Sequence, residues 1–276
     1  MASADGCYLS PLPAELLSHL FTFLPTLVDV LNFAVTCSRH QQIWQQNAHR
    51  IYRHVGPRSI ECPHHARVFL ADQGGVQPSA ALTARDVVQL VRNSAAVERS
   101  VDLFNQKYVS CLQTHAYIRS GCYHFYGPIP THLSPSERHR LIRAIYQLSG
   151  LLLLDPDARE KRMASLKLKD VMTISDVAYG YRDAQDVLMT VKTEYPILEG
   201  IAFQLQSVRD RIVAEVLQDP DRIRVASGEM GWQGCISIWD TFYEDFKQLV
   251  TVTGDRRVYG PVDEVWYDTS DEEGMD

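Results

Sequence analysis

The sequence lacks the short motifs that mark common catalytic and nucleotide-binding sites. It contains no nucleophile elbow, P-loop, dinucleotide fingerprint or zincin helix. Gly228, Gly231 and Gly234 recur at three-residue spacing, but no lysine follows them and no strand pattern precedes them, so they indicate turns. No pair of acidic or histidine side chains is fixed at a catalytic separation by the sequence alone. We therefore expect a protein that is not an enzyme and that needs no cofactor.

Positive charge is scarce at the start of the chain, and uninterrupted apolar runs are short. Residues 1–11 contain no lysine or arginine, whereas a signal peptide begins with a basic segment. A membrane-spanning helix needs about 20 mainly apolar residues. The most apolar segment, 9–44, is interrupted by Glu15, His19, Pro25, Asp29 and Asn32. We expect neither a signal peptide nor a membrane anchor, and therefore a cytoplasmic or nuclear location, or both.

The charge balance excludes two further classes of partner. The 276 residues carry a formal net charge of −7. General binding to nucleic acid or to anionic lipid needs a positive surface. We therefore expect no nucleic-acid partner and no membrane partner.

Internal repeats and a clear metal-binding pattern are also missing. Trp239-Asp240 is a solitary dipeptide, and no leucine-rich or kelch periodicity occurs. Six cysteines are scattered through a long chain, which is weak evidence for disulfides. A tetrahedral zinc site could in principle be built from Cys111, His115, Cys122 and His124. Their spacing is uncommon for structural zinc, and Cys111 continues the apolar stripe of a predicted helix, so we expect no metal site. Cys62, His64 and His65 lack a fourth ligand nearby.

The composition is that of an ordinary globular protein, and its first third predicts three short helices. Hydrophobic residues make up 45% and charged residues 22% of the chain. Pro13 suits the first turn of a helix, and Pro25 ends or bends that helix. Asp29 is the predicted N-cap of a second helix, and a third begins near Ser38. The apolar stripe of the first helix comprises Leu16, Leu17, Leu20, Phe21 and Leu24, and that of the third Ile43, Trp44, Ala48, Ile51, Tyr52 and Val55.

These three helices hold more apolar residues than they can bury among themselves, which predicts a surface for a partner. The segment "LPAELLSHLFTFLPTLVDVLNFAVTCSRHQQIW" resembles an F-box: Leu-Pro at the start, Glu-Leu-Leu next, and a later cysteine. The continuation "TCSRHQQIWQQNAHRIYRHV" is similar to the variant found in filamentous fungi. The matching positions are Leu12, Pro13, Glu15, Leu16, Leu17, Leu20, Leu24, Leu31, Val35, Cys37, Arg39 and Trp44.

The resemblance implies a docking role. An F-box module does no chemistry: it binds a Skp-family adaptor, which joins it to a cullin RING ubiquitin ligase, and the rest of the chain selects a protein substrate. The residues that the resemblance assigns to adaptor binding are Leu12, Pro13, Leu16, Leu17, Leu20, Leu24, Leu31, Val35 and Trp44. The sequence does not identify the substrate.

Two alternatives stay open at this point. The first is an all-α enzyme or small-ligand binder in which the first three helices are ordinary core. The second keeps the adaptor contact but acts outside ubiquitin ligation.

The remainder of the chain is expected to be mainly α-helical. We divide the chain into an F-box-like three-helix module at 8–55, a linker or loop region at 56–82 with a short helical piece near 65–71, and an α-helical domain at 83–262. An acidic, disordered tail follows at 263–276, in which Ser270 and Glu273 resemble an acidophilic kinase site.

Local signals set the expected helices of this domain. Thr83 and Asp86 form a loose capping pattern, and a helix restarts at Ser94. Ser134 with Pro135 and Glu137 has the form of a capping box with a favoured proline. Asp155 precedes another helix, and two more are expected around 176–192 and 196–217. The helix at 196–217 carries a core stripe of Ile197, Ile201, Leu205, Val208, Ile212 and Val216. The pattern also allows short strands near 249–253 and 257–259.

Overall fold

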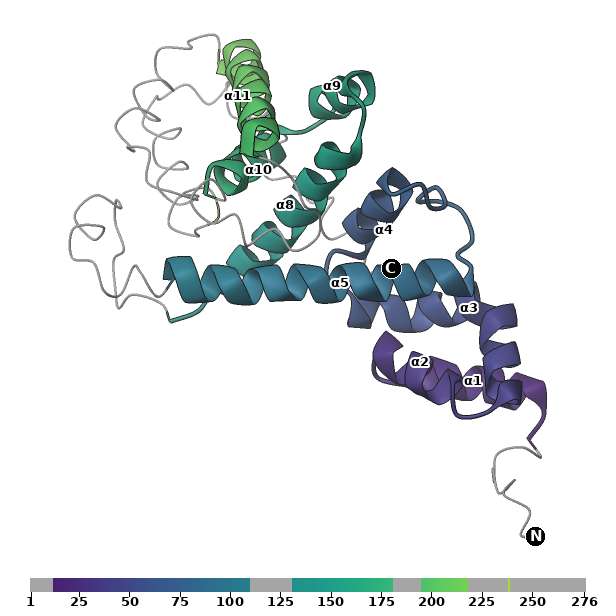
Figure 1. Cartoon of the computed structure of the whole chain (residues 1–276). Helices are drawn as coiled ribbons and strands as arrows, with labels where there is room; N and C mark the ends of the chain where they lie inside the picture. Colours follow the sequence, from purple (N-terminus) through teal and green to yellow (C-terminus); the bar gives the residue numbers. More distant parts are fainter. Residues whose placement is uncertain (1–11, 110–130, 181–194, 218–237, 239–276) are drawn as a thin grey trace. The chain divides into compact units, whose positions relative to one another are not determined.

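The computed structural model describes residues 12–109, 131–180, 195–217 and 238 (Figure 1). The described parts of the chain are helices and their connecting loops, without a strand among them, so the fold class is all-α as the sequence predicts. These residues fall into two compact units that divide between Ala95 and Ala96. None of the helices within the described ranges is both long and apolar enough to span a bilayer.

The first helix, α1 (Ala14–Phe23), is bounded by two prolines. Pro13 is the N-cap residue, one position before the first helical turn in which it was expected. Its carbonyl accepts the Leu17 N–H at 3.1 Å, which is the first hydrogen bond of the helix. At the other end, Leu24 has extended backbone because the residue before a proline is disfavoured in the helical region.

The second helix, α2 (Leu27–Ala34), begins earlier than the sequence predicts. Its N-cap is Thr26, and the assignment of Asp29 to that position is wrong. The Thr26 hydroxyl accepts the Asp29 N–H at 3.1 Å, and the Asp29 carboxylate accepts the Thr26 N–H at 3.2 Å. This reciprocal pair is a capping box, in which an acidic residue occupies the third helical position.

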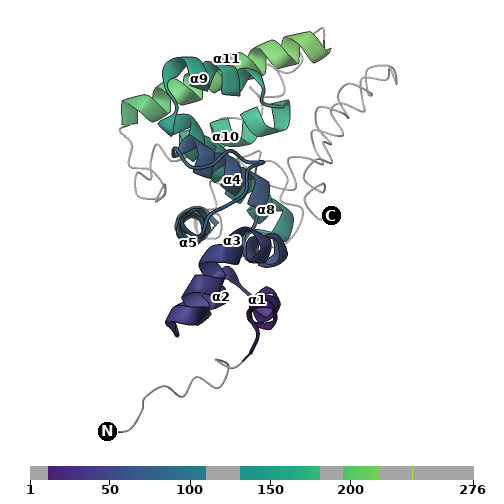
Figure 2. The same cartoon turned by 90° about the vertical axis from the view of Figure 1, so that its right-hand side faces the viewer.

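The third helix, α3 (Ser38–Ser59), begins at the predicted residue and carries the packing face on which α1 and α2 lie (Figures 1 and 2). The six apolar residues predicted for this face are all buried. The helix continues through Gly56 and Pro57, which the sequence analysis placed in a linker. An added Cβ at Gly56 would lie 2.7 Å from Cε2 of the Tyr52 ring, so glycine leaves room for the ring to pack there.

The segment between α3 and α5 (Ala84–Phe104) contains a packed helix, α4 (Pro63–Asp72), longer than the predicted piece. α4 buries Ala66, Phe69 and Leu70. The following turn is held to α3 by the Leu82 N–H, which donates to Nδ1 of His49 at 3.2 Å. Residues 63–82 are therefore part of a packed unit.

Helix α5 begins with the predicted cap, since the Thr83 and Asp86 side chains each bond the other residue's backbone N–H. It runs without the predicted restart at Ser94 and ends in a π-helical turn, Asn105–Val109. Serine has only a modestly low helix propensity, so neighbouring apolar residues carry the helix through this position.

The second unit contains α8 (Pro135–Leu153), α9 (Pro156–Ala164), α10 (Leu168–Gly180) and α11 (Tyr195–Leu217). Helix α10 packs against both α8 and α11 (Figure 2). The predicted caps of α8 and α9 are confirmed: the Ser134 hydroxyl accepts from the Glu137 N–H at 3.2 Å, and the Asp155 carboxylate from the Ala158 N–H at 2.9 Å.

Helix α10 begins eight residues before the predicted start at 176, because its apolar face already includes Val171 and Ile174. In α11 the predicted buried stripe is confirmed at Ile201 and Leu205 and is wrong at Ile197. Ile197 is exposed, and the buried side chains are Leu198, Ile201, Ala202 and Leu205.

Several predictions lie outside the described residues. These are the zinc candidates Cys111, His115, Cys122 and His124, the strands near 249–253 and 257–259, the triple-glycine segment, and the acidic tail with Ser270.

Candidate protein-docking surface

The core of the N-terminal helices is an aromatic cluster that joins α1, α2 and α3. The Phe21 ring lies 4.9 Å from that of Phe33 and 6.5 Å from that of Trp44, measured between ring centroids. Phe33 also packs on the buried His40 ring at 4.4 Å. Such aromatic contacts add to the free energy gained by burying the rings. The three helices therefore have a core of their own beneath their outer faces.

Helix α1 has two apolar faces, only one of which enters this core. Leu17 and Phe21 are buried completely, whereas Leu16 is 52% exposed and Phe23 is 69% exposed. Leu16, Leu20 and Phe23 are spaced at i, i+4 and i+7, so they lie along one side of the helix. We call these three residues the α1 stripe.

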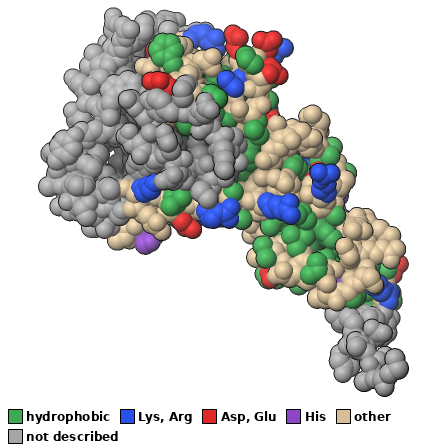
Figure 3. All heavy atoms as spheres, in the orientation of Figure 1, with side chains coloured by type: hydrophobic (Ala, Val, Ile, Leu, Met, Phe, Trp, Pro, Cys, Tyr) green, Lys and Arg blue, Asp and Glu red, His purple; other side chains and the backbone are tan. Residues whose placement is uncertain are grey.

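Helix α2 repeats this arrangement. Leu27, Val30 and Ala34 are buried, while Val28 is 52% exposed and Val35, at its C-cap, is 75% exposed. Val28, the half-buried Leu31 and Val35 are spaced at i, i+3 and i+7 and form the α2 stripe. Figure 3 shows hydrophobic side chains gathered over this N-terminal part of the molecule.

The structure separates the nine predicted adaptor-binding residues into three groups. Pro13, Leu16, Leu20 and Val35 are exposed, and Leu12, Leu24 and Leu31 are partly buried. Leu17 and Trp44 lie inside the core, so they can influence docking only by supporting the surface above them.

Phe23 and Val28 were not predicted as docking residues, although they are among the most exposed large apolar side chains of the described residues. Helical spacing in the sequence could have predicted both residues. Phe23 lies three residues after Leu20, and Val28 lies three residues before Leu31, so each extends a stripe by one helical turn.

Polar contacts within this unit are those of a folded core. Nδ1 of His40 lies 2.8 Å from the Thr36 hydroxyl, but His40 is buried against Phe33 and has a packing role. No group of three or more possible metal ligands occurs among the residues that the structure describes. Cys62 is buried at the start of α4, which places the Cys62-Pro63-His64-His65 sequence in a helix terminus.

The pKa of Tyr52 departs clearly from its usual value. Burial raises the pKa of the Tyr52 hydroxyl, and the nearby Arg67 guanidinium opposes that effect. The guanidinium carbon lies 5.8 Å from the centre of the Tyr52 ring, in the position of a cation–π contact. The hydroxyl oxygen has no hydrogen-bond partner among the described residues. Tyr52 is buried and belongs to neither stripe.

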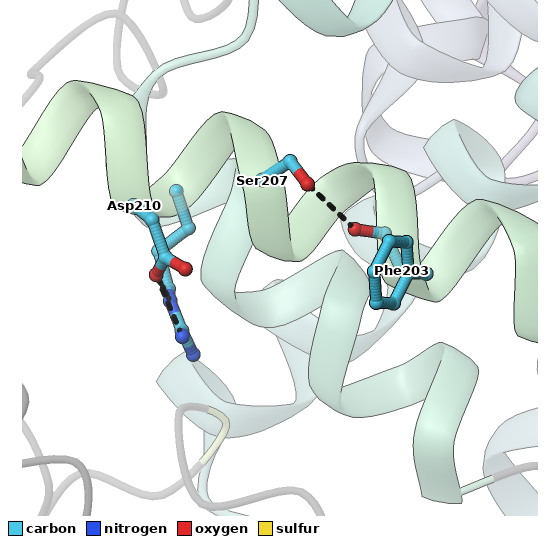
Figure 4. A network of polar contacts seen from close by, with 4 residues as sticks. Phe203, Ser207 and Asp210 are labelled. Atoms are coloured by element: carbon cyan, nitrogen blue, oxygen red, sulfur yellow. Dashed lines mark hydrogen bonds and ion pairs between the residues drawn. The ribbon is translucent and has the colours of Figure 1, made fainter.

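The second unit has no comparable run of exposed apolar residues in its described part. Ile197 and Phe203 of α11 are exposed, but they are six positions apart, which places them on different sides of the helix. The surroundings of Phe203 are shown in Figure 4, where the Ser207 hydroxyl donates to the Phe203 carbonyl at 3.3 Å. The adjacent Arg209–Asp210 ion pair, at 2.8 Å, is also a contact within α11.

Comparison of the chain with protein-family models, curated proteins and solved structures found no match.

Proposed function

We propose that the protein is a non-catalytic substrate receptor that binds a Skp-family adaptor through the α1 and α2 stripes. The observation that carries this proposal is the division of α1 into two apolar faces. Leu17 and Phe21 complete the internal core, and Leu16, Leu20 and Phe23 remain exposed beside them. An apolar stripe on a helix with a finished core is the feature of helix-into-groove recognition.

The energetics favour coverage of this surface. Burying a leucine or phenylalanine side chain completely contributes roughly 1.5–3 kcal/mol relative to leaving it exposed. The two stripes together offer several such side chains, partly offset by the free-energy cost of association. The F-box resemblance of residues 12–44 selects the Skp-family adaptor as the partner, and through it a cullin. Under this proposal a protein substrate binds elsewhere on the chain.

If the first three helices were ordinary core, the apolar residues of the α1 stripe would be buried by other parts of the same chain. Leu16, Leu20 and Phe23 are exposed, which does not fit that requirement. The second alternative, adaptor binding outside ubiquitin ligation, differs only in whether a cullin is present. Purification of the complex from cells followed by detection of cullin distinguishes the two, and the ligase proposal requires cullin to be present.

The test is co-purification of the full chain with a purified Skp-family adaptor. We expect Leu16→Asp to abolish co-purification because a carboxylate cannot be buried in an apolar contact without a large desolvation cost. The circular dichroism of this variant should match the wild type, since the Leu16 side chain is half exposed in the folded protein.

The matched control is Gln45→Asp, which places the same charge on an exposed position of α3 outside the stripes. This variant should bind the adaptor as the wild type does. Full retention of adaptor by Leu16→Asp would contradict the proposal.

A further inference from the structure

The last turn of α3 forms hydrogen bonds with the connection between α1 and α2. Arg58, in the last turn of α3, donates from Nη2 to the carbonyl oxygens of Thr22 at 2.7 Å and Leu24 at 2.5 Å. The neighbouring Ser59 hydroxyl oxygen accepts the Leu27 N–H at 2.9 Å. These backbone groups are a carbonyl of the last turn of α1, the carbonyl of its C-cap residue and the first N–H of α2, and they have no partner within their own helices.

The α1–α2 connection lies between the two exposed stripes in the sequence. Phe23, the last residue of the α1 stripe, lies between the two carbonyls that Arg58 bonds. Val28, the first residue of the α2 stripe, follows the N–H that Ser59 bonds. Arg58 and Ser59 therefore fix the backbone where one stripe ends and the other begins.

The opposite end of α1 is held in the same manner. Nη2 of Arg39, at the start of α3, donates to the Leu12 carbonyl at 2.7 Å, just before α1 begins. Arginines from the two ends of α3 thus bond backbone carbonyls at the two ends of α1. Hydrogen bonds from a charged donor are stronger than neutral ones.

We propose that Arg58 is a positioning residue for adaptor docking: it sets the last turn of α1 so that Phe23 and Val28 meet the partner together. This inference rests on the proposed function. Its physical basis is preorganisation, because a surface that is already fixed in its bound geometry loses less conformational entropy on binding. Arg58 needs no contact with the adaptor for this effect.

The experiment measures the adaptor affinity of the full chain by isothermal titration calorimetry. Arg58→Ala should weaken binding by about tenfold or more, the range expected for loss of charge-assisted hydrogen bonds. Arg58→Lys, which keeps a charged donor, should recover part of the affinity. The matched control is Arg53→Ala, which removes an exposed arginine of the same helix that bonds none of the described residues. It should bind within about twofold of the wild type.

A double-mutant cycle separates positioning from a general loss of stability. If Arg58 acts through Phe23, then Arg58→Ala should have a much smaller effect on affinity in a Phe23→Ser background than in the wild type. Amide hydrogen exchange at Leu27 should also accelerate in Arg58→Ala while exchange at the buried Ile51 amide stays unchanged. Equal affinities of wild type and Arg58→Ala, or fully additive effects with Phe23→Ser, would overturn the inference and leave the docking proposal intact. A wild-type chain that binds no adaptor would overturn both.

Discussion

The two units of this protein differ in how many large apolar side chains they expose among the described residues. Of the eight large apolar side chains that are exposed among the described residues, five lie between Leu16 and Val35. In the second unit, α8 buries eleven of its nineteen residues, including the charged Arg143. Because the first three helices also have a complete aromatic core, their exposed residues are an addition to a finished fold. This difference in exposure supports the proposal that the α1 and α2 stripes form a docking surface.

The second unit contains a buried ion pair between two of its helices. Arg143 of α8 bonds Asp170 of α10 at 2.7 Å, and both side chains are less than a tenth exposed. In the first unit, Arg39 and Arg58 of α3 donate to backbone carbonyls near its surface. Arginine also bonds backbone carbonyls in the second unit, where Arg159 of α9 donates to Leu151 at 2.8 Å and to Leu154 at 2.9 Å.

The largest effect should come from breaking the buried ion pair. We expect Arg143→Ala to lower the free energy of unfolding by about 3–5 kcal/mol, because Asp170 would remain as a buried charge without its partner. Arg209→Ala breaks a pair at 2.8 Å in which Asp210 is 60% exposed, and it should lower the free energy of unfolding by at most about 1 kcal/mol. Urea unfolding of both variants checks this contrast, and similar losses would show that the Arg143–Asp170 pair is not what joins α8 and α10.

Adjacent leucines of α1 provide the next test. Leu17→Ala should lower the free energy of unfolding by about 2–5 kcal/mol because it leaves a cavity in the aromatic core. Leu16→Ala should change the free energy of unfolding by no more than about 0.5 kcal/mol, as is usual for surface positions. Chemical denaturation of the two variants measures the difference. Equal costs would mean that both faces of α1 are packed, and the distinction between core and stripe would fail.

Alanine substitution at two helical glycines should change the stability of the protein in opposite directions. Gly56→Ala should destabilise the protein by about 1–2 kcal/mol, since the new Cβ would meet the Tyr52 ring at 2.7–2.9 Å. Gly200→Ala in α11 meets nothing within 4 Å and should stabilise it by about 0.5–1 kcal/mol through helix propensity. Thermal unfolding of the pair gives the signs, and a stabilising Gly56→Ala would contradict the close packing of Tyr52.

The smallest effect concerns pH. Burial raises the pKa of Tyr52 in the folded state, so above about pH 10 the unfolded chain loses this proton before the folded chain does. Stability should therefore fall as pH rises from that point until the folded-state pKa is passed, and Tyr52→Phe should remove this part of the decline. At pH 7, Tyr52→Phe should leave the free energy of unfolding almost unchanged because the hydroxyl has no partner among the described residues. Unfolding curves of both proteins between pH 7 and pH 11 provide the measurement, and identical alkaline declines would contradict burial of this hydroxyl.

The parts of the fold that depend on local chemistry could be predicted from the sequence. The caps at Thr83, Ser134 and Asp155 were found because each cap involves residues three apart in the chain. The buried side of α3 was found because its apolar residues recur at helical spacing. The cap of α2 was missed because Thr26 and Asp29 are both good capping residues, and the choice between them depends on where Pro25 stops α1.

The exposed residues of the candidate docking surface could be predicted only in outline. Leu16, Leu17, Leu20, Phe21 and Leu24 form one broad apolar pattern in the sequence, and the pattern does not say which edge of it meets α3. The contacts of Arg58 could not be predicted at all, because they join residues 34 and 36 positions apart and depend on how α1 lies on α3.

The most direct test of the account is solvent protection of the α1 stripe on adaptor binding. Hydroxyl-radical footprinting of the full chain, alone and with a saturating Skp-family adaptor, reports the exposure of individual leucine and phenylalanine side chains. We predict strong protection of Leu16, Leu20 and Phe23, with Phe203 of α11 labelled equally in both samples. Unchanged labelling of the α1 stripe in a sample that contains the bound adaptor would contradict the account.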